Sequence, residues 1–157
     1  MKNELKQELT RRLCECNNGG LVLVMYDIYF GFSEDVKAAL ASNDRAALKK
    51  AVADVQAALD ELIGALDFKY PLAGQLYPLY SYCKRLFSTV LYSLDVSVVD
   101  EADVIMKKLR NSFETAAADD KSAPLMDNAQ KVYAGMTYGR GRLTESFIND
   151  DNRGFLA

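Results

Sequence analysis

Residues 48–66 read LKKAVADVQAALDELIGAL, a stretch with a strong helical period. Its large apolar side chains recur at spacings of four and three residues, as in a helix that buries one face. They are Leu48, Val52, Val55, Leu59, Leu62 and Leu66. Asn43 or Asp44 can cap the start of this helix, because their side-chain oxygens accept hydrogen bonds from backbone N–H groups of the first turn. The stretch is therefore predicted to be one helix of a bundle.

The same period occurs in three further stretches. The first, over 21–41, has on one face Leu21, Met25, Ile28, Phe32, Val36 and Ala39 or Leu40. The second, over 76–94, has Leu76, Leu79, Cys83, Leu86, Val90 and Leu94. The third, over 98–116, has Val98, Ala102, Ile105, Leu109, Ser112 or Phe113, and Ala116. Four long helices with short breaks predict an all-α fold, an antiparallel up-and-down four-helix bundle.

Two local features bear on the helix ends. Ser97 and Asp100 have the spacing of a capping box, which predicts that the last of these helices starts there. Pro78 is tolerated if its helix starts around Leu76. Otherwise Pro78 should kink the helix, because proline lacks the N–H group and its ring clashes with the preceding turn.

The length of the chain sets its domain organisation. With 157 residues, the chain fits one domain, since domains typically have about 100–150 residues. We expect a helical bundle over 1–118, in which 1–20 form an N-terminal cap helix and a hinge at Asn17–Gly20. The cap helix carries along one stripe Leu5, Leu9, Leu13 and Cys16. We expect 119–157 to be a C-terminal extension that is either packed on the bundle or flexible.

The composition argues against an enzyme. The chain has no histidine, which removes the commonest general base and every histidine-containing metal site. Its three cysteines, Cys14, Cys16 and Cys83, are too few for a four-cysteine zinc site, and their odd number favours reduced thiols. We therefore expect no catalytic residues, no cofactor and no metal.

Charge and hydropathy limit the partners. The net charge is −3, and no dense basic block could neutralise a phosphate backbone, so we expect no nucleic acid partner. The longest apolar stretch, Leu21–Phe32, is too short to span a bilayer and contains Asp27, so no membrane insertion is expected. Because no secretory signal opens the chain, a cytoplasmic location is expected.

The stretch Leu21–Phe32 is apolar on nearly every face. A bundle helix needs one buried stripe, so its second side must be covered by another part of the chain or by a partner. Aromatic side chains gather at Tyr77–Phe87, and others lie at Tyr26, Tyr29 and Phe30. They are either ordinary core residues or part of a binding surface, where tyrosine is enriched.

Four segments, taken in chain order, form a set of motifs. They are LVLVMYD at 21–27 followed by ND at 43–44, LDEL at 59–62 leading to LD at 66–67, LYPLYSY at 76–82, and LRNSF at 109–113. In this order and with these helix lengths, the segments resemble the FliS family of flagellin-specific export chaperones. The resemblance covers about Leu21 to Ala117.

The resemblance implies a non-enzymatic export chaperone. Family members bind the C-terminal segment of flagellin, which is disordered before assembly, and let it fold as helices around the bundle. Binding blocks premature polymerisation in the cytoplasm and presents flagellin to the flagellar type III export gate. The implied partners are thus the flagellin C-terminal segment and components of the export gate. The expected contact residues are Val22, Met25, Tyr26, Tyr29, Phe32, Leu76, Leu79, Tyr80, Tyr82 and Phe87.

One alternative from another class stays open. The chain could be a structural or regulatory helical bundle that self-associates through Leu21–Phe32 and binds no flagellin. Its mark would be a stable homodimer that is indifferent to flagellin peptides.

Overall fold

Helices make up all the regular secondary structure in residues 3–125, the part of the chain that a computed structural model describes. They are α1 (Asn3–Glu15), α2 (Asn18–Ser42), α3 (Arg45–Gly64), α4 (Pro71–Ser93) and α5 (Val96–Ala117). No strand occurs among these residues, so the predicted all-α class is confirmed. The expected C-terminal extension lies outside the described residues from position 126 onwards.

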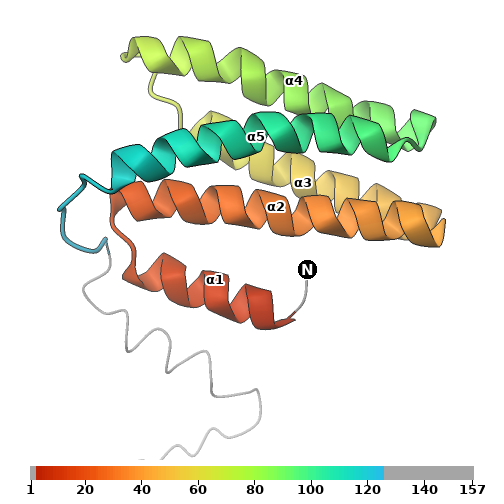
Figure 1. Cartoon of the computed structure of the whole chain (residues 1–157), viewed down its shortest axis with the longest axis horizontal. Coiled ribbons are helices and arrows are strands. Elements are labelled where there is room, and N and C mark those ends of the chain that lie inside the picture. Colours follow the sequence, from red (N-terminus) through yellow and green to blue (C-terminus); the bar gives the residue numbers. More distant parts are fainter. Residues whose placement is uncertain (1–2, 126–157) are drawn as a thin grey trace, which may run out of the picture. The chain divides into compact units, whose positions relative to one another are not determined.

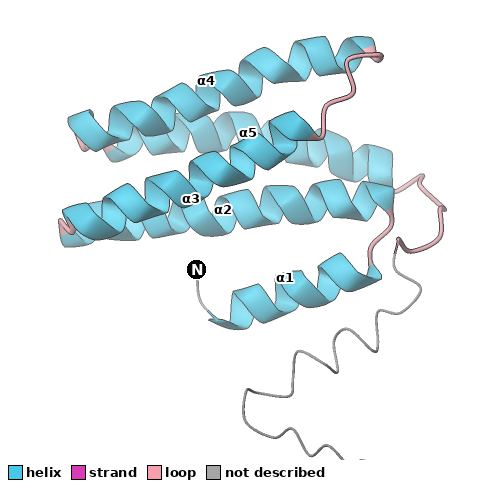
Figure 2. Cartoon of the chain, turned by 180° about the vertical axis from the view of Figure 1, so that it is seen from behind, coloured by secondary structure: helices cyan, strands magenta, loops and turns pink. Residues whose placement is uncertain are grey.

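Helices α2 to α5 form the predicted four-helix bundle (Figure 1). Helix α2 contacts α3 and α5, and α4 contacts the same two helices, so the four close into a ring around one core. The α2–α3 and α4–α5 connections are two residues long, which places the joined helices antiparallel. Helix α1 lies outside the ring and, of the described helices, contacts α2 alone (Figure 2).

The core is built from the helical seams. On α3 the predicted face is correct, and the buried members of the series are Leu48, Val52, Val55, Leu59 and Leu62. On α4 the predicted face is partly wrong, because Leu79 and Leu94 are 37% and 39% exposed. The buried face of α4 runs instead through Tyr80 and Phe87, so aromatic residues take the core positions that aliphatic ones were expected to fill.

The helix caps agree with the sequence at α3 but not at α5. Asp44 caps α3 by accepting hydrogen bonds from two N–H groups of its first turn, each at 3.0 Å. At α5 the predicted capping box is wrong. The cap is Asp95, whose carboxylate accepts the N–H of Ser97 at 2.9 Å. Leu94 adopts a left-handed conformation (φ 55°), so the chain turns from α4 into α5 before it reaches the predicted cap at Ser97. Asp100 pairs with Lys37 and does not complete a capping box.

Proline is accommodated at two positions of α4. Pro71 occupies the start of the helix, where its missing N–H has no intrahelical partner in any case. Because the helix begins at Pro71, five residues before Leu76, Pro78 lies inside it. Pro78 and Gly74, whose carbonyl would accept the missing bond, are both exposed, so water can satisfy that carbonyl.

The junction between α1 and α2 differs from the expected hinge. Asn18 to Gly20 form the first turn of α2, and Asn17 is its N-cap, accepting the Gly20 N–H at 2.9 Å. Asp120, which follows α5, accepts the Gly19 N–H at 3.0 Å, while its backbone carbonyl accepts a bond from the Asn17 side chain at 3.1 Å. The two glycines thus permit close packing at a capped helix start rather than a break in the helix.

Replacing Gly19 by alanine is expected to destabilise the bundle by about 1–3 kcal/mol. A Cβ at this position would lie 2.9 Å from Ala117 Cβ and 3.2 Å from Asp120 Oδ2, so α5 would have to shift. Gly74→Ala is the matched control, because a Cβ there meets nothing within 4 Å. It should stabilise α4 by up to about 1 kcal/mol through helix propensity. Urea unfolding of both variants measures the two effects, and a stabilising Gly19→Ala would contradict the close packing.

Candidate protein-binding site

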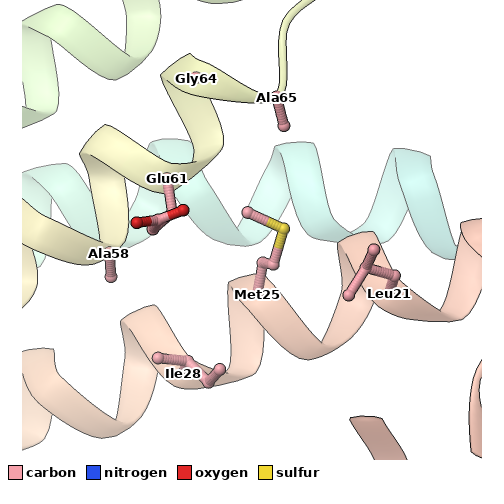
Figure 3. Close-up of a pocket in the computed structure, with 7 residues that line it drawn as sticks. All are labelled: Leu21, Met25, Ile28, Ala58, Glu61, Gly64 and Ala65. Atoms are coloured by element: carbon pink, nitrogen blue, oxygen red, sulfur yellow. The ribbon is translucent and has the colours of Figure 1, made fainter. Parts of the chain in front are cut away.

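An open apolar groove runs between α2 and α3 (Figure 3). Its walls are Leu21, Met25 and Ile28 on α2, and Ala58, Glu61, Gly64 and Ala65 at the end of α3. The α3 wall is made mostly of small residues, and this leaves a space into which Met25 projects. We name this space the α2–α3 groove.

A second apolar groove adjoins the first, because Met25 and Ala65 line both. It lies at the connection between α3 and α4. Its other lining residues are Val22, Leu62, Leu66, Asp67, Tyr70, Leu72, Ala73, Leu76, Tyr80 and Phe113. At its edge, Tyr70 and Leu72 are 67% and 53% exposed. We name it the α3–α4 groove, and the two together the joined groove.

Three aromatic side chains hold α2, α4 and α5 together at the floor of the α3–α4 groove. The hydroxyls of Tyr26 and Tyr80 are 2.6 Å apart, and both residues are buried. The ring of Tyr26 packs against Phe113 with 5.6 Å between the centroids. Burial raises the pKa of both tyrosines, so the hydrogen-bonded pair stays protonated at neutral pH. The floor of the groove is therefore closely packed and uncharged.

Asp27, the next residue on α2, binds two arginines. Its Oδ1 accepts a bond from Arg110 Nε on α5, and its Oδ2 accepts one from Arg12 Nη1 on α1, each at 2.7 Å. The side chains of Asp27 and Arg110 are 18% and 24% exposed. The hydrogen bond that Arg110 donates to Asp27 raises the pKa of Arg110, which keeps the guanidinium charged. One carboxylate thus ties both α1 and α5 to α2.

A second polar cluster joins α2 to α5. Asp103 Oδ1 accepts bonds from the hydroxyls of Tyr29 at 3.0 Å and Ser33 at 2.7 Å. Its Oδ2 pairs with Lys37 Nζ at 2.8 Å. Burial opposes the charge of Lys37, but its bonds to Asp103 and Asp100 outweigh this and raise its pKa. These bonds satisfy the polar groups on the inner face of α2 and fix its register against α5.

The predicted contact residues are divided between core and surface. Buried in the core are Tyr26, Tyr29, Leu76, Tyr80 and Phe87. Among these, Leu76 and Tyr80 also reach the floor of the joined groove. Val22 and Met25 are half-buried and line it. The lining residues do not include Phe32, Leu79 and Tyr82. The structure thus brings four of the predicted residues together at one groove.

The comparison with known protein families concerns most of the chain. Residues 1–120 match the family described as flagellar protein FliS. The chain belongs to the FliS family. The resemblance read from the sequence is therefore confirmed, and the family is one of flagellar export chaperones rather than of enzymes. A search of curated proteins found no match.

Three of the four motifs that carry the FliS resemblance contact one another through side chains of α2, α4 and α5. Tyr26 and Asp27 belong to the first motif, Tyr80 to the third, and Arg110 and Phe113 to the fourth. Their side chains make three contacts, which are the Tyr26–Tyr80 hydrogen bond, the Tyr26–Phe113 ring contact and the Asp27–Arg110 ion pair. These contacts give a physical reason for the motifs to occur together in a FliS chain.

In this FliS chain, α1 covers the outer face of α2 and leaves the joined groove open. The seam between α1 and α2 includes Leu9 and Phe30, and none of residues 3–15 lines the joined groove. Leu9 and Cys14 are buried, but Leu5 and Leu13 are 39% and 38% exposed, so the predicted apolar stripe is only partly correct. Helix α1 thus covers the part of α2 that includes Phe30, whereas Leu21, Met25 and Ile28 of α2 line the open groove.

Sequence reasoning missed the groove residues that follow α3. These are Ala65, Leu66, Tyr70 and Leu72. A signal was present, since residues 68–72 read FKYPL and place three large apolar side chains in or next to a helix connection. Clustered apolar side chains outside a helical seam indicate an interaction surface.

Two further findings concern residues 3–125 of this FliS chain. None of their helices is long and apolar enough to cross a membrane. No three acidic, cysteine or histidine side chains among them are grouped so as to hold a metal ion.

Proposed function

We propose that this chain binds the disordered C-terminal segment of flagellin in the cytoplasm, prevents its premature polymerisation and delivers it to the flagellar type III export apparatus. The observation that supports this most is the joined groove, an open apolar surface on a helical bundle of the FliS family. An amphipathic helix binds such a groove by laying its apolar face into it.

The mechanics of binding follow from the groove and its support. A disordered segment that folds on binding buries on the order of 1,000–3,000 Å² and loses a few kcal/mol to ordering. The chaperone adds little to this loss of free energy, because the Tyr26–Tyr80 pair holds the floor in place beforehand and the Asp103 cluster fixes α2, which forms one wall. Since α1 lines neither groove, binding there requires no displacement of α1.

Among the expected contact residues, we propose that Val22 and Met25 touch the flagellin segment directly, with Leu76 and Tyr80 beneath it. Leu66, Tyr70 and Leu72 extend this surface along the α3–α4 groove. The segment that leaves one groove can continue into the other, because Met25 and Ala65 border both.

Calorimetric titration of the full chain with a C-terminal fragment of flagellin from the same organism tests the proposal. We expect a 1:1 complex and a clearly negative heat-capacity change, because apolar surface is buried. An N-terminal flagellin fragment is the control and should give no heat. Absence of both heat and co-elution with the C-terminal fragment would overturn the proposal. A stable homodimer in sedimentation equilibrium, unchanged by the fragment, would favour the self-associating alternative.

A further inference from the structure

The charge of the joined groove has one sign. Among the described residues that line it, Glu61 and Asp67 are charged, and no lysine or arginine is present. Glu61 projects from α3 into the α2–α3 groove, towards the wall formed by α2 (Figure 3). A carboxylate on the wall of an otherwise apolar groove is a specific feature, because it repels some ligands and attracts others.

The carboxylate of Glu61 has no hydrogen-bond or ion-pair partner among residues 3–125, the part of the chain that the structure describes. Its neighbour Asp60 differs, since Lys84 Nζ lies 2.6 Å from Asp60 Oδ1. Asp54, two turns earlier, pairs with Lys50 at 3.4 Å. Glu61 is thus the carboxylate of this half of α3 that faces the groove and is free to bind a cation.

The position of Glu61 in its helix is electrostatically unfavourable. It lies in the last turn of α3, which ends at Gly64 and has no basic residue in that turn. The C-terminus of a helix carries partial negative charge and favours cations. Asp67, in the connection that follows, adds a further negative charge on the groove. A cation bound at this end of the helix would relieve the repulsion.

We propose that Glu61 selects the segment that the groove accepts: an amphipathic helix with one lysine or arginine at the edge of its apolar face, which pairs with Glu61. This inference rests on the proposed function, which gives flagellin as the occupant of the groove, and it adds the charge pattern of the flagellin segment. Asp67 strengthens the attraction through the shared negative potential. A segment with an acidic residue at the same place is rejected, because two carboxylates would then face each other in an apolar groove.

Binding of the flagellin C-terminal fragment to Glu61→Gln and Glu61→Lys tests the proposal. We expect the affinity to fall about 5-fold for Glu61→Gln and about 20-fold for Glu61→Lys. Both variants should melt about 1–3 °C higher than the parent, because the repulsion at the end of α3 is removed. Asp54→Asn removes a charge from the same helix outside the joined groove, and it should bind within about 2-fold of the parent.

The reciprocal change locates the partner of Glu61. Each lysine and arginine of the fragment is replaced by glutamate in turn. One replacement should weaken binding to the parent and restore binding to Glu61→Lys to within about 3-fold of the original pair. If the parent binds the fragment but Glu61→Lys binds it equally well, or no replacement restores binding, the role of Glu61 is overturned and the proposed function stands. If the parent binds no fragment, the proposed function itself fails.

Discussion

Replacing Ala65 by arginine is expected to lower the affinity for the flagellin C-terminal fragment at least about 100-fold. Ala65 borders both grooves, so one long side chain there obstructs the place where they meet. The guanidinium would lie one turn after Glu61 and pair with it along the α3 wall of the groove. A helix docking over it would have to displace this pair or bury an arginine in an apolar surface.

The fold of Ala65→Arg should be unchanged. Ala65 is exposed and has ordinary helical backbone angles (φ −79°, ψ −6°) at the C-cap of α3, where a basic side chain is favourable. Ala53→Arg places the same side chain on an exposed site of α3 that lines neither groove and should bind like the parent. Calorimetric titration of both variants, with their melting temperatures, checks this. Equal affinities would show that flagellin docks elsewhere.

The bundle could be predicted from the sequence because its determinants are local. The spacing of apolar residues in 48–66 fixes the buried face of α3, and Asp44 supplies its cap within the same few residues. The errors lie where a tertiary contact overrides a local pattern. Gly19 and Gly20 predict a break, yet Asp120 lies more than a hundred residues away in sequence and bonds to this turn. No local pattern contains that contact.

The groove could not be predicted in the same way. Met25 and Tyr26 are adjacent, apolar and part of one motif, but Met25 lines the groove and Tyr26 is fully buried. The difference depends on which residues of the neighbouring helices face each side chain. Tyr26 faces Tyr80 and Phe113, whereas the wall opposite Met25 contains Ala58, Gly64 and Ala65, which leave space. To tell a groove residue such as Met25 from a core residue such as Tyr26, one must know which helices pack against each other.

Replacing Asp27 by alanine is expected to lower the free energy of unfolding by about 2–3 kcal/mol and the melting temperature by roughly 5–10 °C. The carboxylate binds Arg12 and Arg110 at 2.7 Å each, and the side chain of Arg110 is 24% exposed. Removing Asp27 leaves Arg110 with Glu114, at 3.1 Å, as its remaining ion-pair partner. A partly buried guanidinium that loses its main acceptor destabilises the fold more than the loss of a surface pair.

Thiol labelling distinguishes detachment of α1 from α2 from unfolding of the whole bundle. Cys14 lies on α1 and is 4% exposed, whereas Cys83 is in the bundle core, where burial raises its thiol pKa to about 12.

In Asp27→Ala, Cys14 should react faster than in the parent, because Arg12 loses the carboxylate that holds α1 on α2. Cys83 should react only as the whole bundle opens. Arg12→Ala is the matched control: it should speed the labelling of Cys14 similarly but lower the free energy of unfolding by only about 0.5–1 kcal/mol, because Asp27 keeps Arg110. Equal loss of stability in Arg12→Ala and Asp27→Ala would mean that the contact with α1, and not the pair with α5, dominates the role of Asp27.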